Sequence, residues 1–413
     1  MRKLSFQASL LVLSLLIVSL LTGGCMNREP VTSKKPAPAD SVDNRLVAAN
    51  TGFGFKLFQE INRQDPEQNI FISPASIAMV LAMTYNGADG ETKKAMAETL
   101  ELKGLSLEEV NRANADLRTI LENPDPGVNL TTANSLWARN GFDFKPEFIQ
   151  VNKEYYGAEV KNMDFTAPGA PAAINRWVSQ NTNGRIDKII DRIDRDDILF
   201  FINTLYFKGK WTDEFDPMQT RERLFTLTDG TQKKHPMMSR TGEYGYYQGN
   251  SFQSVRIPYG NKRVSMYVFL PNQDTCLDEF YQNLTIENVK KWMSEFQEKK
   301  VSLVLPRFQF EYEVELNNVL KDLGMEVAFD ANRANFGKMC SIPPNIYIDE
   351  VKHKTFVEVN EQGTEAAAVT SVLMCGGIPE VLNMVVDRPF FFMIRDDKTE
   401  TILFMGSVTE PQA

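Results

Sequence analysis

Histidine is scarce in this sequence, and its scarcity limits the catalytic chemistry that the chain could perform. Only two histidines, His235 and His353, occur among the 413 residues. Any Ser-His-Asp triad, Cys-His pair or histidine-rich metal site would therefore depend on one of them. The sequence contains no G-x-S-x-G or H-E-x-x-H motif and no P-loop pattern. These absences disfavour most hydrolases, and we predict that the protein is not an enzyme and holds neither a metal ion nor a cofactor.

Charge and cysteine content exclude further classes. The chain carries 45 Lys and Arg against 54 Asp and Glu, a net charge of -9, without a cluster of basic residues. We therefore expect no nucleic acid partner, because phosphate binding requires concentrated positive charge. Cys276, Cys340 and Cys375 lack C-x-x-C spacing, so neither a zinc site nor a disulfide framework is predicted, and at most one pair could form.

Residues 361–387 form the most unusual stretch, because they separate a strand pattern ending near Asn360 from one beginning near Arg388. Connections in compact domains usually span about four to six residues, and longer ones are either linkers or functional. Linker composition is absent here, since residues 364–374 read TEAAAVTSVLM, small at first and then β-branched and apolar. Alternate residues of an extended chain share one face, so this segment could enter a sheet small end first. The segment has the pattern of a strand without a partner strand. We infer that the protein stores free energy that pairing of this segment would release.

The elements that must position this segment are helices and strands in mixed order. Helical patterns occur at 46–61, 73–87, 174–181 and 315–323. Strand patterns occur at 265–270, 300–305, 354–360 and 401–405. Because the two kinds do not alternate regularly, the sequence predicts an α+β fold with large, mostly antiparallel sheets. No linker interrupts this pattern after residue 46, so we predict a single domain at 46–413.

The N-terminal residues predict export. Arg2 and Lys3 precede an apolar run at 10–21, which is too short for a membrane span but suits the core of a secretory signal peptide at 1–24. Residues 25–45 are rich in proline and charge and poor in large apolar side chains, which is the composition of a flexible tether.

The end of this signal indicates lipidation. The sequence LTGGC at residues 21–25 resembles a bacterial-type lipobox, in which Cys25 would carry the lipid. Thr22 stands where that pattern prefers leucine, so ordinary cleavage near Gly24 is the alternative. We expect an exported protein, either anchored to the membrane at the cell surface through a lipid on Cys25 or secreted into the extracellular space.

The sequence EQGTEAAA at residues 361–368 resembles the hinge of the serpin family of serine protease inhibitors. Further segments resemble serpin motifs in the family's order: NIFISPASI at 69–77, INRWV at 174–178, NTLYFKGKW at 203–211, LPRF at 305–308, HK at 353–354, and 388–406, which begins RPF and ends FMG. The resemblance extends over nearly all of residues 46–411. It implies a serpin fold, with three β-sheets, eight to nine helices and an exposed reactive-centre loop at about 361–387.

The resemblance also implies a function. A serpin of the inhibitory kind is a suicide inhibitor: a serine protease cleaves the loop, and the loop then inserts into the central sheet and traps the acyl-enzyme. The expected partner of this chain is therefore a serine protease, bound covalently by a monomeric inhibitor. The alternative is a non-inhibitory serpin that acts as a binding protein.

The matched motifs imply roles for individual residues. The hinge comprises Glu361, Gly363, Thr364, Glu365, Ala366, Ala367 and Ala368. The shutter, a buried hydrogen-bond cluster beneath the sheet, comprises Ser73, Ser76, Asn203 and His353, and Trp211 matches the breach, where the loop first enters. Gln362 and Val369 depart from the usual acidic and small residues, but neither is bulky enough to prevent insertion. Thr364 would be buried on insertion, and its lack of charge favours an inhibitor, because an unpaired buried charge is costly.

The resemblance implies a cleaved bond at Gly377-Ile378, because serpins usually place this bond 14 residues beyond the hinge glycine, here Gly363. If the bond is instead counted back from Pro389, it falls one residue later, because the loop has one residue more than is usual in the family. Met374-Cys375 and Cys375-Gly376 are the alternative bonds. Because Gly377 offers no side chain to a specificity pocket, we expect an elastase-like or subtilisin-like protease. A trypsin-like protease is not expected, because no Lys or Arg occurs between Glu361 and Asp387.

Overall fold

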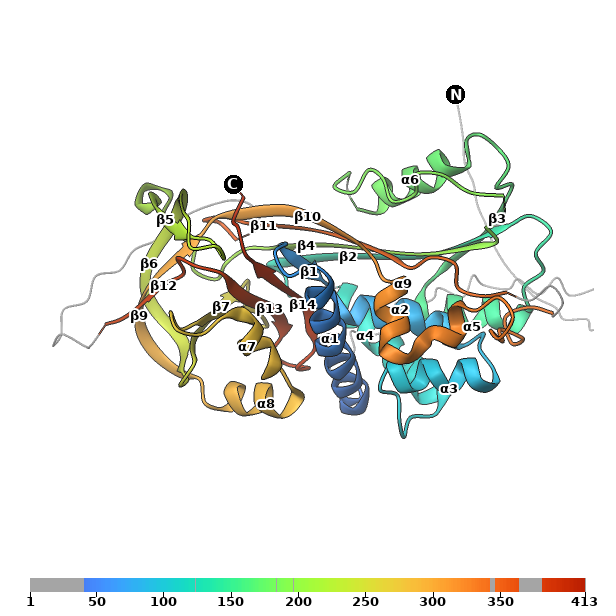
Figure 1. Cartoon of the computed structure of the whole chain (residues 1–413), viewed down its shortest axis with the longest axis horizontal. Helices are drawn as coiled ribbons and strands as arrows, with labels where there is room; N and C mark the ends of the chain where they lie inside the picture. The colour runs from blue at the N-terminus through green and yellow to red at the C-terminus, as the bar shows by residue number, and fades with distance from the viewer. Residues whose placement is uncertain are drawn as a thin grey trace, which may run out of the picture. The chain divides into compact units, whose positions relative to one another are not determined.

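Helices and strands alternate irregularly along the chain (Figure 1). The structure is a computed structural model that describes residues 41–122, 124–182, 184–195, 197–341, 346–363 and 381–412. Its helices are α1 (Asn44–Gln64), α2 (Pro74–Tyr85), α3 (Gly90–Thr99), α4 (Leu107–Glu122), α5 (Pro146–Tyr156), α6 (Ala170–Asn181), α7 (Leu277–Gln282), α8 (Ile286–Ser294) and α9 (Asn317–Leu320). Short 3-10 or π turns lie at Pro217–Gln219, Lys321–Met325 and Glu326–Phe329.

A five-stranded sheet runs through the middle of this body (Figure 1). Its strands, in spatial order, are β10 (Phe308–Glu315), β11 (Lys352–Val359), β4 (Leu199–Gly209), β2 (Val128–Arg139) and β3 (Glu159–Met163). Helix α6 covers one face, whereas α1, α2 and α4 lie on the other (Figure 1). The sheet is therefore buried on both faces over part of its length, and any strand added to it would have to enter between two layers.

A second network of nine strands holds the remaining sheet structure. It contains β1 (Ile70–Ile72), β14 (Ile402–Val408), β13 (Phe390–Asp396), β8 (Val264–Pro271), β7 (Phe252–Tyr259), β6 (Gln232–Gln248), β9 (Gln297–Pro306), β12 (Leu382–Val385) and β5 (Arg221–Thr226). The long strand β6 pairs with β7 only through residues 245–248 and with β5 and β9 through the rest of its length. The network is thus two sheets joined through β6, and together with the five-stranded sheet they make three. Three sheets and nine helices in the described residues confirm the predicted α+β fold.

The predicted elements are found with small shifts at their ends, with one correction. The helical patterns at 46–61 and 73–87 correspond to α1 and α2. Ser73, which precedes Pro74 in the sequence, caps α2, because its side chain accepts a hydrogen bond from the Ser76 amide. The prediction that the chain stays without a strand up to Arg388 was wrong, because β12 begins at Leu382. Met384 and Val386 are fully buried there, so this short segment adds apolar surface to the core as well as hydrogen bonds to β9.

The core is divided into two clusters. The large one contains most buried apolar side chains of the body, including the stacked Phe71 and Phe404. The small one joins α6, and the connection that follows it, to the face of β2 and β4 opposite α2. Its members are Trp137, Phe165, Ile174, Trp177, Val178, Ile186, Ile189, Ile190, Phe200 and Ile202. Helix α6 is therefore held on the sheet by a core of its own.

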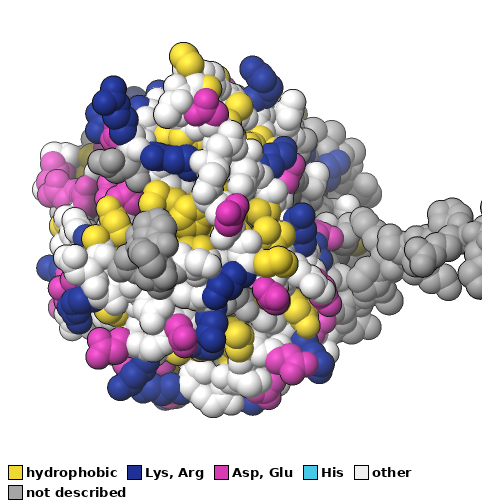
Figure 2. Space-filling view, turned by 90° about the vertical axis from the view of Figure 1, so that its right-hand side faces the viewer, with side chains coloured by type: hydrophobic (Ala, Val, Ile, Leu, Met, Phe, Trp, Pro, Cys, Tyr) yellow, Lys and Arg dark blue, Asp and Glu magenta, His cyan; other side chains and the backbone are white. Residues whose placement is uncertain are grey.

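Two kinds of functional feature are absent from the described residues. None of the helices there is both long and apolar enough to span a membrane. Nor does that part of the chain gather three or more His, Cys, Asp or Glu side chains in a way that could hold a metal ion. Figure 2 shows basic and acidic side chains interspersed over one face of the molecule, without a patch of a single sign.

Candidate strand insertion site

The interface between β4 and β11, called the seam below, is the least extensively paired line within the five-stranded sheet. The two strands are parallel and are paired through three residue pairs, Lys354 with Thr204, Thr355 with Leu205 and Phe356 with Tyr206. The antiparallel neighbours on either side are longer, with eight pairs between β10 and β11 and eleven between β2 and β4. The sheet therefore consists of two well-paired halves joined by a short seam.

A buried hydroxyl at the seam also lacks a hydrogen-bond partner among the described residues. This hydroxyl belongs to Thr204. A buried polar group without a partner raises the free energy of the state that contains it. An additional strand between β4 and β11 would bring new donors and acceptors to this position.

Beneath the seam, β11 is fastened to the start of α2. His353 is buried, and its Nε2 accepts a hydrogen bond of 3.2 Å from the backbone amide of Ser73. The Ser73 hydroxyl in turn accepts a hydrogen bond of 3.4 Å from the Ser76 amide. Burial lowers the pKa of His353 to about 3, so the ring is neutral at neutral pH and its accepting nitrogen carries no proton. Thr355 adds a further link, since its hydroxyl donates to the carbonyl of Phe71 over 2.5 Å.

The predicted shutter residues are thus brought together in part. Ser73, Ser76 and His353 form one connected group. The backbone of Asn203 lies in β4, where it pairs with Asn134 of β2, but its side chain lies outside the part of the chain that the structure describes. The geometry therefore places three of the four predicted residues directly behind the seam.

At the end of β11 the chain folds back in a tight turn. Asn360 and Gly363 exchange two backbone hydrogen bonds of 3.0 and 3.1 Å, and Gly363 also forms a bridge with Lys210 at the end of β4. Gly363 has φ +105°, and a Cβ there would lie 2.3 Å from the carbonyl oxygen of Gly209. Only glycine fits this position, because a side chain would clash with the backbone of the neighbouring strand. The turn closes the top of the seam.

Glu361 fixes this turn by an ion pair. Its buried carboxylate accepts hydrogen bonds of 2.7 and 2.8 Å from Nε of Arg307, and the hydroxyl of Thr220 also donates to it. Its backbone carbonyl accepts from the amide of Phe215 over 2.8 Å. Burial would raise the pKa of Glu361, but the hydrogen bonds from Arg307 and Thr220 hold it below its ordinary value. The hinge is therefore anchored by a charged group whose partners come from distant parts of the chain.

Trp211, which the resemblance assigns to the breach, lies against the hinge turn. Its indole Nε1 donates to the carbonyl of Asn360 over 2.9 Å, and its backbone amide donates to that of Gln362 over 3.2 Å. The ring stacks on Tyr259, with centroids 4.3 Å apart. Trp211 thus ties the hinge turn to the end of β4, at the entrance to the seam.

Three contributors to this site were missed in the sequence. Arg307 and Thr220 hold Glu361, and Tyr259 supports Trp211. Arg307 belongs to the segment LPRF, which resembles a serpin motif, but the resemblance gave this arginine no role. Its partner follows 54 residues later, and no spacing rule connects the two.

Several predicted residues lie outside the described part of the chain. These are the hinge residues Thr364, Glu365, Ala366, Ala367 and Ala368, the candidate bond residues Met374, Cys375, Gly376, Gly377 and Ile378, and the lipidation candidate Cys25. Of the remaining cysteines, Cys276 is exposed and Cys340 is buried, and both are free thiols.

Comparison with known sequences gives a consistent family. The family model described as Serpin (serine protease inhibitor) matches residues 48–411. A serpin-like protein of Methanosarcina acetivorans, named as uncharacterized, is 34% identical over 98% of this chain and 97% of its own. The leukocyte elastase inhibitor of Homo sapiens is 33% identical over 89% of this chain and 100% of its own. Human neuroserpin is 34% identical, covering 86% and 89% of the two chains.

Comparison with solved structures agrees. The native state of the thermophilic serpin tengpin superposes with a TM-score of 0.83 at 33% identity, covering 90% of this chain and 95% of the other. Human thyroxine-binding globulin, solved in complex with its ligand, superposes with a TM-score of 0.81 at 26% identity, covering 90% and 99%. The chain is thus similar both to protease inhibitors and to a binding protein.

Proposed function

This chain belongs to the serpin family, and we propose that it is a suicide inhibitor of serine proteases. Members of the family are protease inhibitors rather than catalysts, and serine proteases are their general partners. The observation that carries the proposal is the seam, a short parallel pairing inside a sheet whose two halves are otherwise well paired. Directly above it, the hinge turn at Gly363 leads into residues 364–380.

The proposed reaction consumes the inhibitor once. The active-site serine of the protease attacks a loop carbonyl, the peptide bond breaks, and the new amino terminus leaves with a proton while the protease remains bound as an ester. The freed segment then fills the seam as an extra strand. With Gly377 at the ester, 14 residues of strand at roughly 3.3 Å each would carry the protease about 46 Å. Trapping is kinetic, because the distorted protease hydrolyses the ester slowly.

The proposed target is an elastase-like or subtilisin-like protease. Gly377-Ile378 is the preferred bond, with Met374-Cys375 and Cys375-Gly376 as alternatives. Small and medium apolar side chains suit shallow specificity pockets. A human relative carries the name leukocyte elastase inhibitor, which agrees with this class.

The test is incubation with a panel of serine proteases, followed by denaturing gel electrophoresis and mass spectrometry. We expect a complex with elastase or subtilisin that survives SDS, and a released peptide that begins at Ile378. Clean cleavage without a complex for every protease would contradict the inhibitory function. A complex with cleavage outside residues 374–379 would instead correct the assigned bond.

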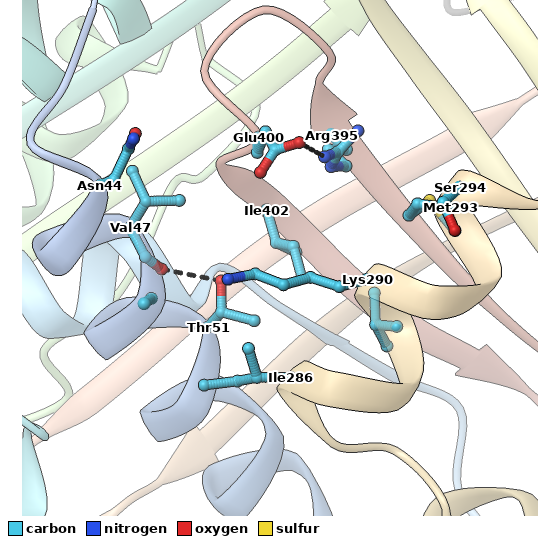
Figure 3. Close-up of a pocket in the computed structure, with 12 residues that line it drawn as sticks. Asn44, Val47, Thr51, Ile286, Lys290, Met293, Ser294, Arg395, Glu400 and Ile402 are labelled. Atoms are coloured by element: carbon cyan, nitrogen blue, oxygen red, sulfur yellow. Dashed lines mark hydrogen bonds and ion pairs between the residues drawn. The ribbon is translucent and has the colours of Figure 1, made fainter.

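A second candidate function is binding of a small molecule, which one pocket favours. This cavity of about 490 Å³ lies between α1, α8 and the hairpin of β13 and β14, and Figure 3 shows residues that line it. Val47, Ile286 and Ile402 provide an apolar wall, and Lys290 reaches across the opening (Figure 3). Arg395 pairs with Glu400 over 3.0 Å at the rim. An apolar wall beside cationic groups suits an amphipathic acid, and a relative of similar fold is a thyroxine-binding globulin.

Thyroxine is therefore the first probe for this alternative. We expect K290Q to weaken binding about tenfold if the pocket takes the ligand's carboxylate, since a charge-assisted contact is worth about 1.4 kcal/mol or more. Titration calorimetry on the full chain with thyroxine and with its decarboxylated analogue measures this. Absence of binding to both would exclude this candidate, whereas protease trapping would be unaffected by K290Q.

We further propose that the protein is exported and held at a membrane by a lipid on Cys25, and that it acts as a monomer. The support is the apolar run at 10–21 and the LTGGC sequence that ends at Cys25. Expression of the full chain in a bacterial host with labelled palmitate, followed by mass spectrometry, tests it. The C25S variant should lose the label, and a wild-type mature chain beginning near Cys25 without lipid would indicate secretion.

A further inference from the structure

The connection that follows α6 lies across the five-stranded sheet and is firmly held there. It belongs to the small core through Ile186, Ile189 and Ile190. The side chain of Asn175 in α6 accepts hydrogen bonds of 2.9 Å from the amides of Ile189 and Ile190 and donates to the carbonyl of Ile190 over 2.7 Å. The path of this connection is therefore fixed relative to α6.

One residue of this connection is placed over the seam. The amide of Arg185 donates to the carbonyl of Thr182 over 3.0 Å, which fixes its backbone. Its guanidinium carbon lies 6.0 Å from the ring centroid of Tyr206 and 5.9 Å from that of Phe356. Tyr206 belongs to β4 and Phe356 to β11, and the two residues are direct partners across the seam. A single cation therefore contacts both strands that insertion must separate.

We propose that Arg185 is a latch on the seam, which holds β4 and β11 together through paired cation-π contacts and so sets the rate of strand insertion. Partner residues of neighbouring strands share a face, so both rings face the α6 side. An added strand would raise the spacing of β4 and β11 from about 4.8 Å to about 9.6 Å. A side chain of the added strand would then stand between the rings, and Arg185 would lose at least one contact. The proposal rests on the insertion mechanism proposed above.

The two cation-π contacts are weak enough for strand insertion to break them. Contacts between an arginine and an aromatic ring are favourable but weak at exposed sites. Two such contacts slow an opening without preventing it. Arg185 is a positioning residue, because it acts on the strands and not on the protease.

The test uses variants of the full chain and needs no target protease. A synthetic peptide with the sequence of residues 364–377 is offered to the uncleaved protein, and its uptake is followed by the rise in melting temperature. R185Q should take up the peptide roughly three- to tenfold faster than wild type, since two weak contacts are lost. The matched control is R192Q on the same connection, where Arg192 is exposed and pairs with Asp194 over 3.3 Å. Its uptake rate should equal that of wild type.

A second measurement separates a latch from general damage. R185Q should lower the melting temperature of the uncleaved protein but not that of protein cleaved within residues 364–380, and R185K should restore much of the difference. The effects of F356L and R185Q on stability should be non-additive in the uncleaved form, where the two side chains are in contact. They should be additive in the cleaved form. Equal destabilisation of both forms, or uptake by R185Q at the wild-type rate, would overturn the latch. Absence of uptake by the wild type would instead count against strand insertion itself.

Discussion

Two parallel strand pairs flank residues 364–380, and their surroundings differ. On the N-terminal side, β11 pairs with β4 through three residues in the interior of a five-stranded sheet. On the C-terminal side, β12 pairs with β9 through four residues at the edge of another sheet. Opening the first pair creates a slot with a strand edge on each side, whereas opening the second only uncovers one edge. A new strand therefore gains twice as many backbone partners at the seam.

The groups that hold the two pairs also differ. Polar groups with directional contacts surround the seam and fix β11, among them His353 with Ser73 of α2 and Glu361 with Arg307. The β12 side is held by the buried Met384 and Val386, and beyond it Arg388 donates to the carbonyl of Pro271 over 2.7 Å. Directional bonds are lost abruptly when geometry changes, but apolar packing tolerates small movement. We infer that the N-terminal side is built to open and the C-terminal side to stay.

The largest effect on the contrast between the two strand pairs is expected from a charged side chain at position 364, the first residue that would enter between β4 and β11. On the proposed function, T364R should make the protein a substrate of the protease and reduce the trapped fraction more than about 100-fold, because insertion would bury an unpaired cation. Quantitative SDS gels of complex against cleaved chain measure the partition. The control E365R carries the same side chain at the neighbouring position, which would face the other way. Equal loss in both variants would show that the orientation assigned to the strand is wrong.

A cavity on the C-terminal side should act differently. M384A should lower the free energy of unfolding by about 2–4 kcal/mol, because it empties a fully buried site. We expect β12 to stay in place in the proposed reaction, so the uncleaved and the loop-cleaved protein should lose similar amounts of unfolding free energy. Chemical denaturation of both forms measures this. A loss confined to the uncleaved form would mean that β12 also moves.

Acid should weaken the seam through His353. Its pKa in the folded protein is about 3, below the ordinary 6.5, so the unfolded chain binds the proton first as pH falls. Stability from this group is complete above pH 6.5 and decreases between 6.5 and 3 by up to about 1.4 kcal/mol per pH unit. The difference in unfolding free energy between wild type and H353Q, measured from pH 7.5 to pH 5, isolates the effect. Parallel curves would contradict it.

The smallest expected effect concerns the hinge ion pair. E361Q should lower the stability of the uncleaved form by about 1 kcal/mol at pH 7, since Arg307 is partly exposed and keeps a neutral hydrogen-bond partner. The pKa of Glu361 lies below its ordinary value, so its contribution is complete above pH 4.5 and is lost as pH falls through the folded-state pKa. Differential calorimetry at pH 7 and pH 3.5 should show the two proteins converging. The cleaved form should be unaffected, because the proposed insertion would straighten the turn.

Much of the site could be predicted from local sequence. Ser73 before Pro74 predicts a helix cap, and the structure shows that bond. The resemblance to the serpin hinge singles out Gly363, and this glycine occupies a position closed to other side chains. Trp211 and His353 were assigned through the resemblance to serpin motifs, and both lie at the ends of the seam. The Ser73 cap can be read from local sequence because a helix cap depends on neighbouring residues only.

The sequence by itself determined the alternation of helices and strands, the long segment after Gly363, and the family to which these belong. Only the tertiary structure decided which strands meet, and hence that β4 and β11 form the short parallel seam. It also decided that Arg307 and Thr220 hold Glu361 and that Arg185 spans both sides of the seam. The reason is physical: Thr220 and Glu361 are 141 residues apart, and such contacts arise from how whole layers pack, not from any periodicity along the chain.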